Sequence, residues 1–215
     1  SEISTGFIRQ IGDCLGLLRN PLLRWLFGFE VLMVVLNHIP YKFYQPYLGL
    51  LNSGTAFNSK TALAAGAHMA AATFVAAWFA RRSARVTEHI GIQRVLLAAA
   101  AIQLFIIGVM GLILHPVVLL LVLFRGVPSG LSRAPLNAAV TPRVPKRQRA
   151  TYLSIQSLVG RLVFSMFLIG LSNAVVAPVG TWPVLSSLLL RSVIVAGFGL
   201  VLLSISSINP KSSQS

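Results

Sequence analysis

The sequence predicts an all-α membrane protein with six transmembrane helices, preceded by an amphipathic helix on the membrane surface. Of its 215 residues, 55% are hydrophobic and only 10% are charged, whereas a soluble domain carries about 25% charged residues. Apolar stretches of roughly 20 residues, the length that crosses a bilayer, recur along the whole chain. Positive charge gathers in alternate connections between these stretches, as the topology of a multi-pass membrane protein requires.

Residues 1–21 are predicted to form the amphipathic helix, which we place on the cytoplasmic surface of the membrane. Asn20 and Pro21 end or bend this helix before the first span. Cys14 is the one cysteine of the chain, which excludes an intramolecular disulfide and a metal site built on several thiolates. One apolar stripe at helical spacing runs along the helix, formed by Ile3, Phe7, Ile11, Cys14 and Leu18.

The transmembrane domain is predicted over residues 22–206, with a cytoplasmic tail over 207–215. Each span is placed where a mainly apolar stretch reaches the length needed to cross the bilayer. The six predicted spans cover residues 22–47, 61–80, 92–114, 116–140, 153–176 and 187–205.

Basic residues identify the cytoplasmic side of this topology. They lie ahead of the first span, between the second and third, between the fourth and fifth, and after the sixth. The other three connections are poor in charge. Both termini are therefore predicted to be cytoplasmic, in a multi-pass protein of the cytoplasmic (inner) membrane. Because topology accounts for the formal charge of +14, no nucleic-acid partner is expected. The basic residues are Arg9, Arg19, Arg24, Arg81, Arg82, Arg85, Arg94, Arg143, Lys146, Arg147, Arg149 and Lys211.

The first predicted span carries an unusual polar stripe. A carboxylate deep in a bilayer is costly and normally faces a protein interior or a water-filled cavity. At 100° per residue, Glu30, Asn37, Tyr41 and Tyr44 fall within about 40° of one another. Pro40 and Pro46 are expected to interrupt this helix near its outer end. Two interpretations remain: Glu30 lines a cavity, or it only pairs with an arginine to hold two helices together.

The fourth predicted span has a matching polar face. Arg125, Ser129 and Ser132 line that face, with Arg133 at its edge. The sequence "RGVPSG" makes this helix close-packing and bendable. Depth in the membrane favours an ion pair between Glu30 and Arg133, which leaves Arg125 to face an aqueous pathway. In the alternative interpretation, Arg133 reaches the cytoplasmic headgroups.

Catalytic motifs do not fit the chain, so no enzyme activity, metal or cofactor is expected. "GVPSG" is similar to the Gly-x-Ser-Gly of intramembrane serine proteases, but every histidine precedes Ser129, and those proteases need a later one. The single aspartate, Asp13, precedes the spans, and no phosphate-binding loop is present. Arg161 and Arg191 are predicted to serve structure, and His68, His89 and His115 lack partners at metal-ligand spacing.

Three segments carry a resemblance to a known family. "LRNPLLRWLF" resembles the entry to helix seven of a major facilitator superfamily transporter, and "TPRVPKRQRATYLSIQSLVGRLVFS" resembles its loop from helix ten to helix eleven, with a Gly160-Arg161 pair. "SARVTEHIGIQRVLL" is similar to the family signature between helices eight and nine, but Ala84 stands at the aspartate position. The whole chain thus resembles the C-terminal half, helices seven to twelve, of such a transporter.

This resemblance implies secondary active transport of a small organic solute across the cytoplasmic membrane. Glu30 could carry a coupling proton, and an anionic or amphipathic aromatic substrate would suit the cationic and aromatic side chains. Such a transporter needs twelve helices, so either the N-terminal six-helix half is on a missing segment or a separate chain, or two copies of this chain pair. The first is favoured because the chain begins with Ser1. The alternative is a non-transporting remnant or assembly partner whose polar residues only fasten helices. The implied substrate-binding residues are Glu30, Asn37, Tyr41, Lys42, Gln45, Arg125, Ser129 and Arg133.

Overall fold

The computed structural model describes residues 11–52, 61–173 and 180–206. In these ranges the chain is helical and contains no strand, and five helices are long and apolar enough to cross a membrane. The predicted class, an all-α membrane protein, is confirmed at this level. Three predicted features lie outside the described residues: the first half of the surface helix, the end of the fifth span and the C-terminal tail.

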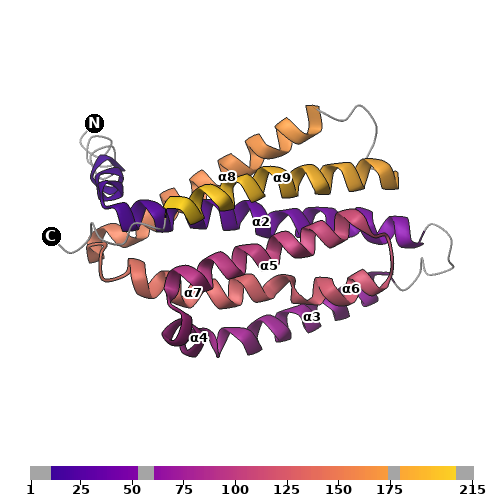
Figure 1. Cartoon of the computed structure of the whole chain (residues 1–215), viewed down its shortest axis with the longest axis horizontal. Helices are drawn as coiled ribbons and strands as arrows, with labels where there is room; N and C mark the ends of the chain where they lie inside the picture. The colour runs from indigo at the N-terminus through magenta and orange to yellow at the C-terminus, as the bar shows by residue number, and fades with distance from the viewer. Residues whose placement is uncertain (1–10, 53–60, 174–179, 207–215) are drawn as a thin grey trace.

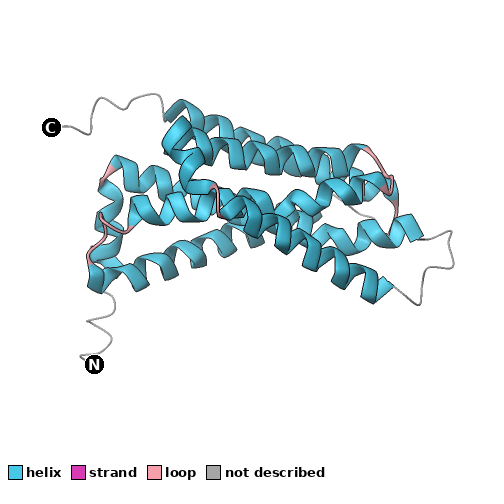
Figure 2. Cartoon of the chain, turned by 90° about the horizontal axis from the view of Figure 1, so that it is seen from below, coloured by secondary structure: helices cyan, strands magenta, loops and turns pink. Residues whose placement is uncertain are grey.

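The helices follow one another with short connections (Figures 1 and 2). A helix over residues 11–16 leads into the 3-10 turn η1, Leu17–Arg19. The elements that follow are α2 (Pro21–Asn52), α3 (Thr61–Ala80), α4 (Ser83–Ile90), α5 (Ile92–Leu112), α6 (Val117–Val122), η3 (Leu123–Gly126), α7 (Val127–Val140), η4 (Lys146–Gln148), α8 (Arg149–Asn173) and α9 (Trp182–Ser206).

Five of the six predicted spans correspond to these long apolar helices. They are α2, α5, α8 with η4, α9, and the continuous stretch Val117–Val140 that contains α6, η3 and α7. The second predicted span matches α3, which is apolar over Gly66–Ala80 but shorter there than the other five. Helix α9 begins at Trp182, earlier than predicted, because Pro183 lies in its first turn, where a missing N–H costs no hydrogen bond.

Helix α2 is continuous, so the predicted interruption at Pro40 and Pro46 is wrong. Pro40 has no N–H and cannot bond to the carbonyl of Leu36, four residues earlier. The buried side chain of Gln103, on α5, donates from Nε2 to that Leu36 carbonyl at 3.4 Å. A neighbouring helix therefore supplies the hydrogen bond that the proline removes, and the helix continues.

The interruption falls instead in the fourth span, where η3 separates α6 from α7. Pro128 cannot donate to the carbonyl of Phe124. That carbonyl accepts a bond from the N–H of Val127, three residues on, which is the tighter 3-10 pattern. The local change in winding thus has a specific cause in the sequence.

The basic connection between the second and third predicted spans contains α4, a short helix that the pattern of charge does not predict. Thr87 donates to the Ser83 carbonyl at 2.7 Å within it. Gly91 joins α4 to α5 with φ of 85°, a conformation that favours glycine because other residues strain their Cβ there. The glycine therefore sets the sharp turn between the two helices.

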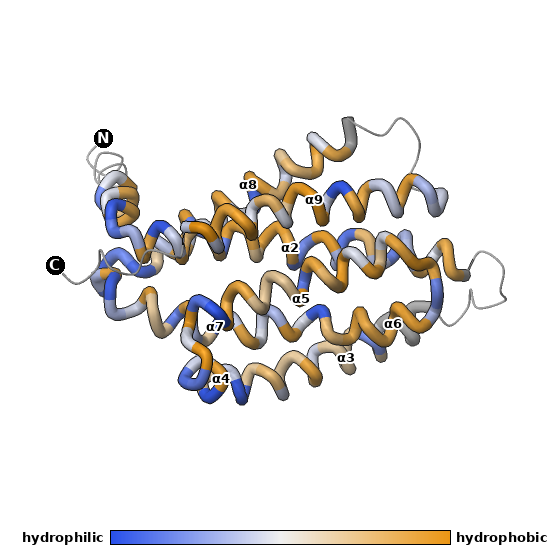
Figure 3. The backbone as a smooth tube through the Cα atoms, in the orientation of Figure 1, coloured by the Kyte–Doolittle hydropathy of each residue, from blue (hydrophilic) through white to orange (hydrophobic). Residues whose placement is uncertain are grey.

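One end of the bundle gathers the basic connections and the ends of the described chain. At this end Trp25 Nε1 donates to the Leu203 carbonyl at 2.9 Å, which joins the start of α2 to the end of α9. The hydroxyl of Tyr152, near the start of α8, donates to the Leu23 carbonyl at 3.4 Å. Figure 3 shows hydrophilic colour concentrated at this end, beside apolar helix bodies. Basic residues on one side agree with the predicted alternation of charge.

The helix over residues 11–16 lies at this end of the bundle and packs against the rest of the protein. Cys14 is buried, and its thiol donates to the Gln148 carbonyl of η4 at 3.9 Å. Leu17 and Leu18 pack against the apolar core of the bundle. Of the predicted apolar stripe, Cys14 therefore contacts the connection between α7 and α8, while Leu18 packs on the core.

Candidate functional site

A pocket of about 350 Å³ lies among α2, α3 and η3, near the end of the bundle opposite the basic connections. We call it the aromatic pocket. Tyr41, Tyr44 and Gln45 reach it from α2 because they recur at helical spacing and share one face. It brings together four of the residues predicted for a binding site. Its lining consists of Tyr41, Lys42, Tyr44, Gln45, Gly66, Met69 and Arg125.

Arg125 is the central cation of the aromatic pocket. Its guanidinium carbon lies 5.1 Å from the centroid of the Tyr44 ring, within the range of a cation–π contact. Nη2 contacts the sulfur of Met69, a weak acceptor. Nη1 is buried and has no hydrogen-bond partner among the described residues. A planar guanidinium with an unused donor is suited to bind a carboxylate or another anion.

His68 continues this stack on the other helix, and sequence reasoning missed it. Its ring is stacked on Tyr44, with centroids 5.0 Å apart and planes inclined by 20°. Nε2 lies 2.9 Å from the Leu119 carbonyl and must donate to it, since a carbonyl only accepts. Nδ1 is buried without a partner in the described part of the chain. The signal in the sequence is a single histidine in an alanine-rich helix. Metal-ligand spacing alone does not reveal its contact with Tyr44.

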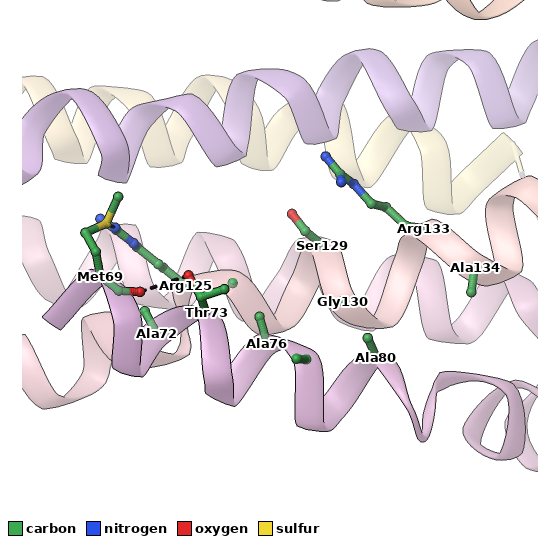
Figure 4. Close-up of a pocket in the computed structure, with 12 residues that line it drawn as sticks. Met69, Ala72, Thr73, Ala76, Ala80, Arg125, Ser129, Gly130, Arg133 and Ala134 are labelled. Carbon is green, nitrogen blue, oxygen red and sulfur yellow. Dashed lines mark hydrogen bonds between the residues drawn. The ribbon is translucent and has the colours of Figure 1, made fainter. Parts of the chain in front are cut away.

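A groove of about 460 Å³ adjoins the aromatic pocket and shares Met69 and Arg125 with it (Figure 4). We call it the alanine groove. Ser129 and Arg133 line it, as predicted for the polar face of the fourth span. Its walls come from α3 and from η3 with α7: Met69, Ala72, Thr73, Ala76, Ala77 and Ala80 on one side, and Arg125, Gly126, Ser129, Gly130, Arg133 and Ala134 on the other.

Small residues bring the two walls of the alanine groove together. A Cβ atom added at Gly126 would lie 2.8 Å from Cβ of Ala76, and one added at Gly130 would lie 2.6 Å from the Ala76 carbonyl oxygen. Both glycines recur at a spacing of four, the pattern of close-packed membrane helices. The sequence "GVPSG", which resembles a protease motif, therefore serves helix packing here.

Glu30 and Arg133 do not form the predicted ion pair. The charge of Arg133 acts on Glu30, but no direct ion pair joins them in the structure as described. Figure 4 shows the Arg133 side chain extending from α7 on the side of Ser129, away from Ala80. Arg133 is exposed, whereas Glu30 is partly buried on α2. The carboxylate and the guanidinium are thus near each other in the bundle without direct contact.

The contacts of α2 with α8 explain where Glu30 lies. Phe27 packs edge-on against Tyr152, and His38 lies beside Phe164 with ring centroids 5.0 Å apart. By this parallel register, Glu30 lies at the level of Gln156, a buried residue whose Nε2 has no partner among the described residues. Helical periodicity predicts which polar residues share a face of α2. It does not predict that α8 packs beside that face.

Two predicted site residues, Glu30 and Asn37, are not among those that line the aromatic pocket or the alanine groove. Oδ1 of Asn37 is buried without a partner, as is Oε1 of Gln103, in the residues that the structure describes. Buried polar atoms without partners are uncommon and call for an explanation such as water or a ligand. The polar side chains of α2 thus continue from the aromatic pocket, through Asn37 and Glu30, toward the middle of the bundle.

No known protein-family model matches the chain, and no curated protein and no solved structure is significantly similar to it. The resemblance to the major facilitator superfamily therefore depends on the sequence segments alone.

Proposed function

We propose that the chain is the C-terminal six-helix half of a major-facilitator-type secondary transporter, which moves a small organic solute across the cytoplasmic membrane. An N-terminal six-helix half, on a missing segment or a separate chain, completes the transporter. Both termini and the basic connections face the cytoplasm, by the positive-inside rule.

The observation that carries the proposal is a repeated packing pattern. Helices α2, α3 and α5 correspond to α7, α8 and α9. Exchanging these two sets reproduces the main contacts: α2 packs on α8 and α9 as α7 packs on α3 and α5, and α5 packs on α9 in either case. The contact of α2 with α5 is the clear departure, because the corresponding contact, between α7 and α9, is weak. Since α2 and α7 run in opposite directions in Figure 1, the repeat is inverted, as in transporter halves.

The aromatic pocket and the alanine groove supply the substrate pathway in this proposal. The aromatic pocket is lined from α2 and the alanine groove from α7, the pair of helices that the repeat relates to each other, and the two cavities share Met69 and Arg125. Arg125 binds an anionic group of the solute, while Tyr41 and Tyr44 offer apolar ring surface. Glu30 carries a coupling proton, since it is the one carboxylate within the predicted spans. Transporter sites of this kind open to each side of the membrane in turn.

Cysteine accessibility in native membrane vesicles tests this proposal. Single cysteines replace Tyr41, Gln45 and Ser129 in a Cys14→Ser background, and a membrane-impermeant thiol reagent is applied to right-side-out and to inside-out vesicles. We expect all three to react, and at least one to react from both sides. The matched control is Ile194→Cys on α9, whose side chain is 71% exposed on an apolar surface and should not react.

Labelling of none of the three positions from either side would mean a dry interior and would overturn the transport proposal in favour of a structural role. A second variant tests the binding role of Arg125. Arg125→Gln should abolish any protection of Gln45→Cys that a set of small aromatic carboxylates provides, while Arg85→Gln, at an exposed position on α4, should not.

A further inference from the structure

The imidazole of His68, on α3, is held by two different contacts. Its Nε2 donates to the Leu119 carbonyl of α6 at 2.9 Å. The face of its ring stacks on Tyr44 of α2, with centroids 5.0 Å apart. The hydrogen bond fixes one edge of the imidazole and the ring contact fixes one face. The side chain therefore has a defined position among three helices.

Tyr44 depends on ring contacts for its orientation. Its side chain is buried, yet its hydroxyl forms no hydrogen bond with another described residue. Packing on the ring therefore decides which way the ring faces. Helix α2 packs chiefly on α8, α9 and α5, and much less on α3. The stack with His68 is thus the contact that fixes the Tyr44 ring on the side of α3.

Arg125 depends in turn on the Tyr44 ring. Its guanidinium carbon lies over that ring, 5.1 Å from the centroid. Of the two terminal nitrogens, Nη2 contacts the Met69 sulfur, a weak acceptor, and Nη1 has no partner among the described residues. The cation–π contact is therefore the interaction that orients the guanidinium in the aromatic pocket.

We propose that His68 is a positioning residue for anion binding: through Tyr44, it holds the Arg125 guanidinium in the orientation that receives the carboxylate of an aromatic solute. The inference rests on the proposed function, since it concerns how the aromatic pocket takes its substrate. Each contact of the series, from the Leu119 carbonyl to Arg125, is made within the described chain. The series therefore does not depend on an N-terminal half.

Two substitutions separate the ring of His68 from its hydrogen-bond donor. His68→Phe keeps an aromatic ring beside Tyr44 and loses the donor to the Leu119 carbonyl. His68→Gln keeps an N–H donor and loses the ring. If His68 acts through Tyr44, the ring is the part that anion binding needs, so the phenylalanine variant should bind anions and the glutamine variant should bind them weakly.

The test uses Gln45→Cys as a reporter, in a Cys14→Ser background of the full chain in native membrane vesicles. The measured quantity is the concentration of benzoate that halves labelling by a thiol reagent. His68→Gln should raise this concentration about tenfold, as expected for loss of a desolvated cation–π contact. His68→Phe should leave it nearly unchanged. The matched control is His89→Gln, at an exposed position on α4, which should have no effect.

Two further measurements distinguish positioning from a general structural role. Benzamide has the shape of benzoate without its charge, so the protection that it gives should be the same in His68→Gln as in the parent. Tyr44→Leu should weaken benzoate protection as His68→Gln does. Adding His68→Gln to Tyr44→Leu should then have little further effect, because both changes interrupt the same series of contacts.

The possible failures have different meanings. Unchanged benzoate protection in His68→Gln would overturn the inference and leave anion binding by Arg125 intact. Equal losses in His68→Gln and His68→Phe, or a parallel loss of benzamide protection, would assign His68 a structural role and also overturn it. Absence of benzoate protection in the parent would instead contradict the anion-binding role of Arg125 in the proposed function, and this inference with it.

Discussion

Gly130 of α7 lies directly against the backbone of Ala76 in α3. A Cβ atom at Gly130 would stand 2.6 Å from the Ala76 carbonyl oxygen and 3.4 Å from the N of Ala80. Backbone atoms inside a helix cannot move aside as the end of a side chain can. The close approach of α3 and α7, which forms the alanine groove, therefore depends on this glycine.

Gly130→Ala should separate α3 from α7 and lower the free energy of unfolding by about 1–3 kcal/mol, the usual cost of overpacking. The measurement is denaturant unfolding of the purified chain in detergent. Gly197→Ala on α9 is the matched control, since nothing lies within 4 Å of its added Cβ, and it should be neutral or stabilising because alanine favours a helix. Equal stability of the two variants would refute the close contact.

Tyr47 ties the outer end of α2 to the connection after α5. Its hydroxyl donates to the Ile113 carbonyl at 2.6 Å and accepts from the N–H of His115 at 3.1 Å. Tyr47→Phe should cost about 1 kcal/mol, because two partly buried backbone groups lose their partner. The same unfolding measurement on Tyr41→Phe, at a side chain that is 59% exposed, should show a change within about 0.5 kcal/mol.

Gln103 and Pro40 should be coupled in a double-mutant cycle. Gln103→Leu removes the side-chain donor to the Leu36 carbonyl and should destabilise the chain. In a Pro40→Ala background, the restored N–H of residue 40 can bond to that carbonyl, so Gln103→Leu should cost less. The difference between the two costs is the measured coupling. A coupling of zero would show that Gln103 does not replace the hydrogen bond that Pro40 removes.

Cys14 should react slowly with thiol reagents. Burial raises the pKa of its thiol, and the negative charge of Asp13 raises the pKa further. Since only the thiolate reacts, a raised pKa lowers the rate at a given pH and moves its rise to higher pH. The rate of alkylation by N-ethylmaleimide is measured against pH. Leu15→Cys in a Cys14→Ser background is the exposed control and should react faster, and a Cys14 rate equal to it would contradict the packing on η4.

The sequence was sufficient to predict most helices because two independent constraints agree: the length of a bilayer span and the alternation of basic connections. It failed where tertiary contacts decide. Pro40 was expected to break α2, but Gln103 of a helix distant in the sequence supplies the missing bond. At Pro128, in contrast, the missing hydrogen bond to the Phe124 carbonyl is replaced by the N–H of Val127 in the same helix, so the winding changes to 3-10 there.

The candidate site shows the same limit. Periodicity placed Tyr41 and Tyr44 on one face of α2, and the resemblance added Lys42 and Gln45. The structure brings all four to Arg125. Periodicity could not assign neighbours, so it predicted a direct ion pair between Glu30 and Arg133 that the described residues do not form. His68 was missed because its partners, Tyr44 and the Leu119 carbonyl, come from two other helices. No spacing within one segment signals such a contact.

Helix α2 is fastened near both of its ends. Trp25 fixes its start to the last turns of α9, and Tyr47 fixes its far end to the backbone that follows α5. These two hydrogen bonds oppose both sliding of α2 along its axis and rotation of α2 about that axis. Helices α2, α5 and α9 are thereby joined at both ends of α2, so we expect the three to move together when the bundle rearranges.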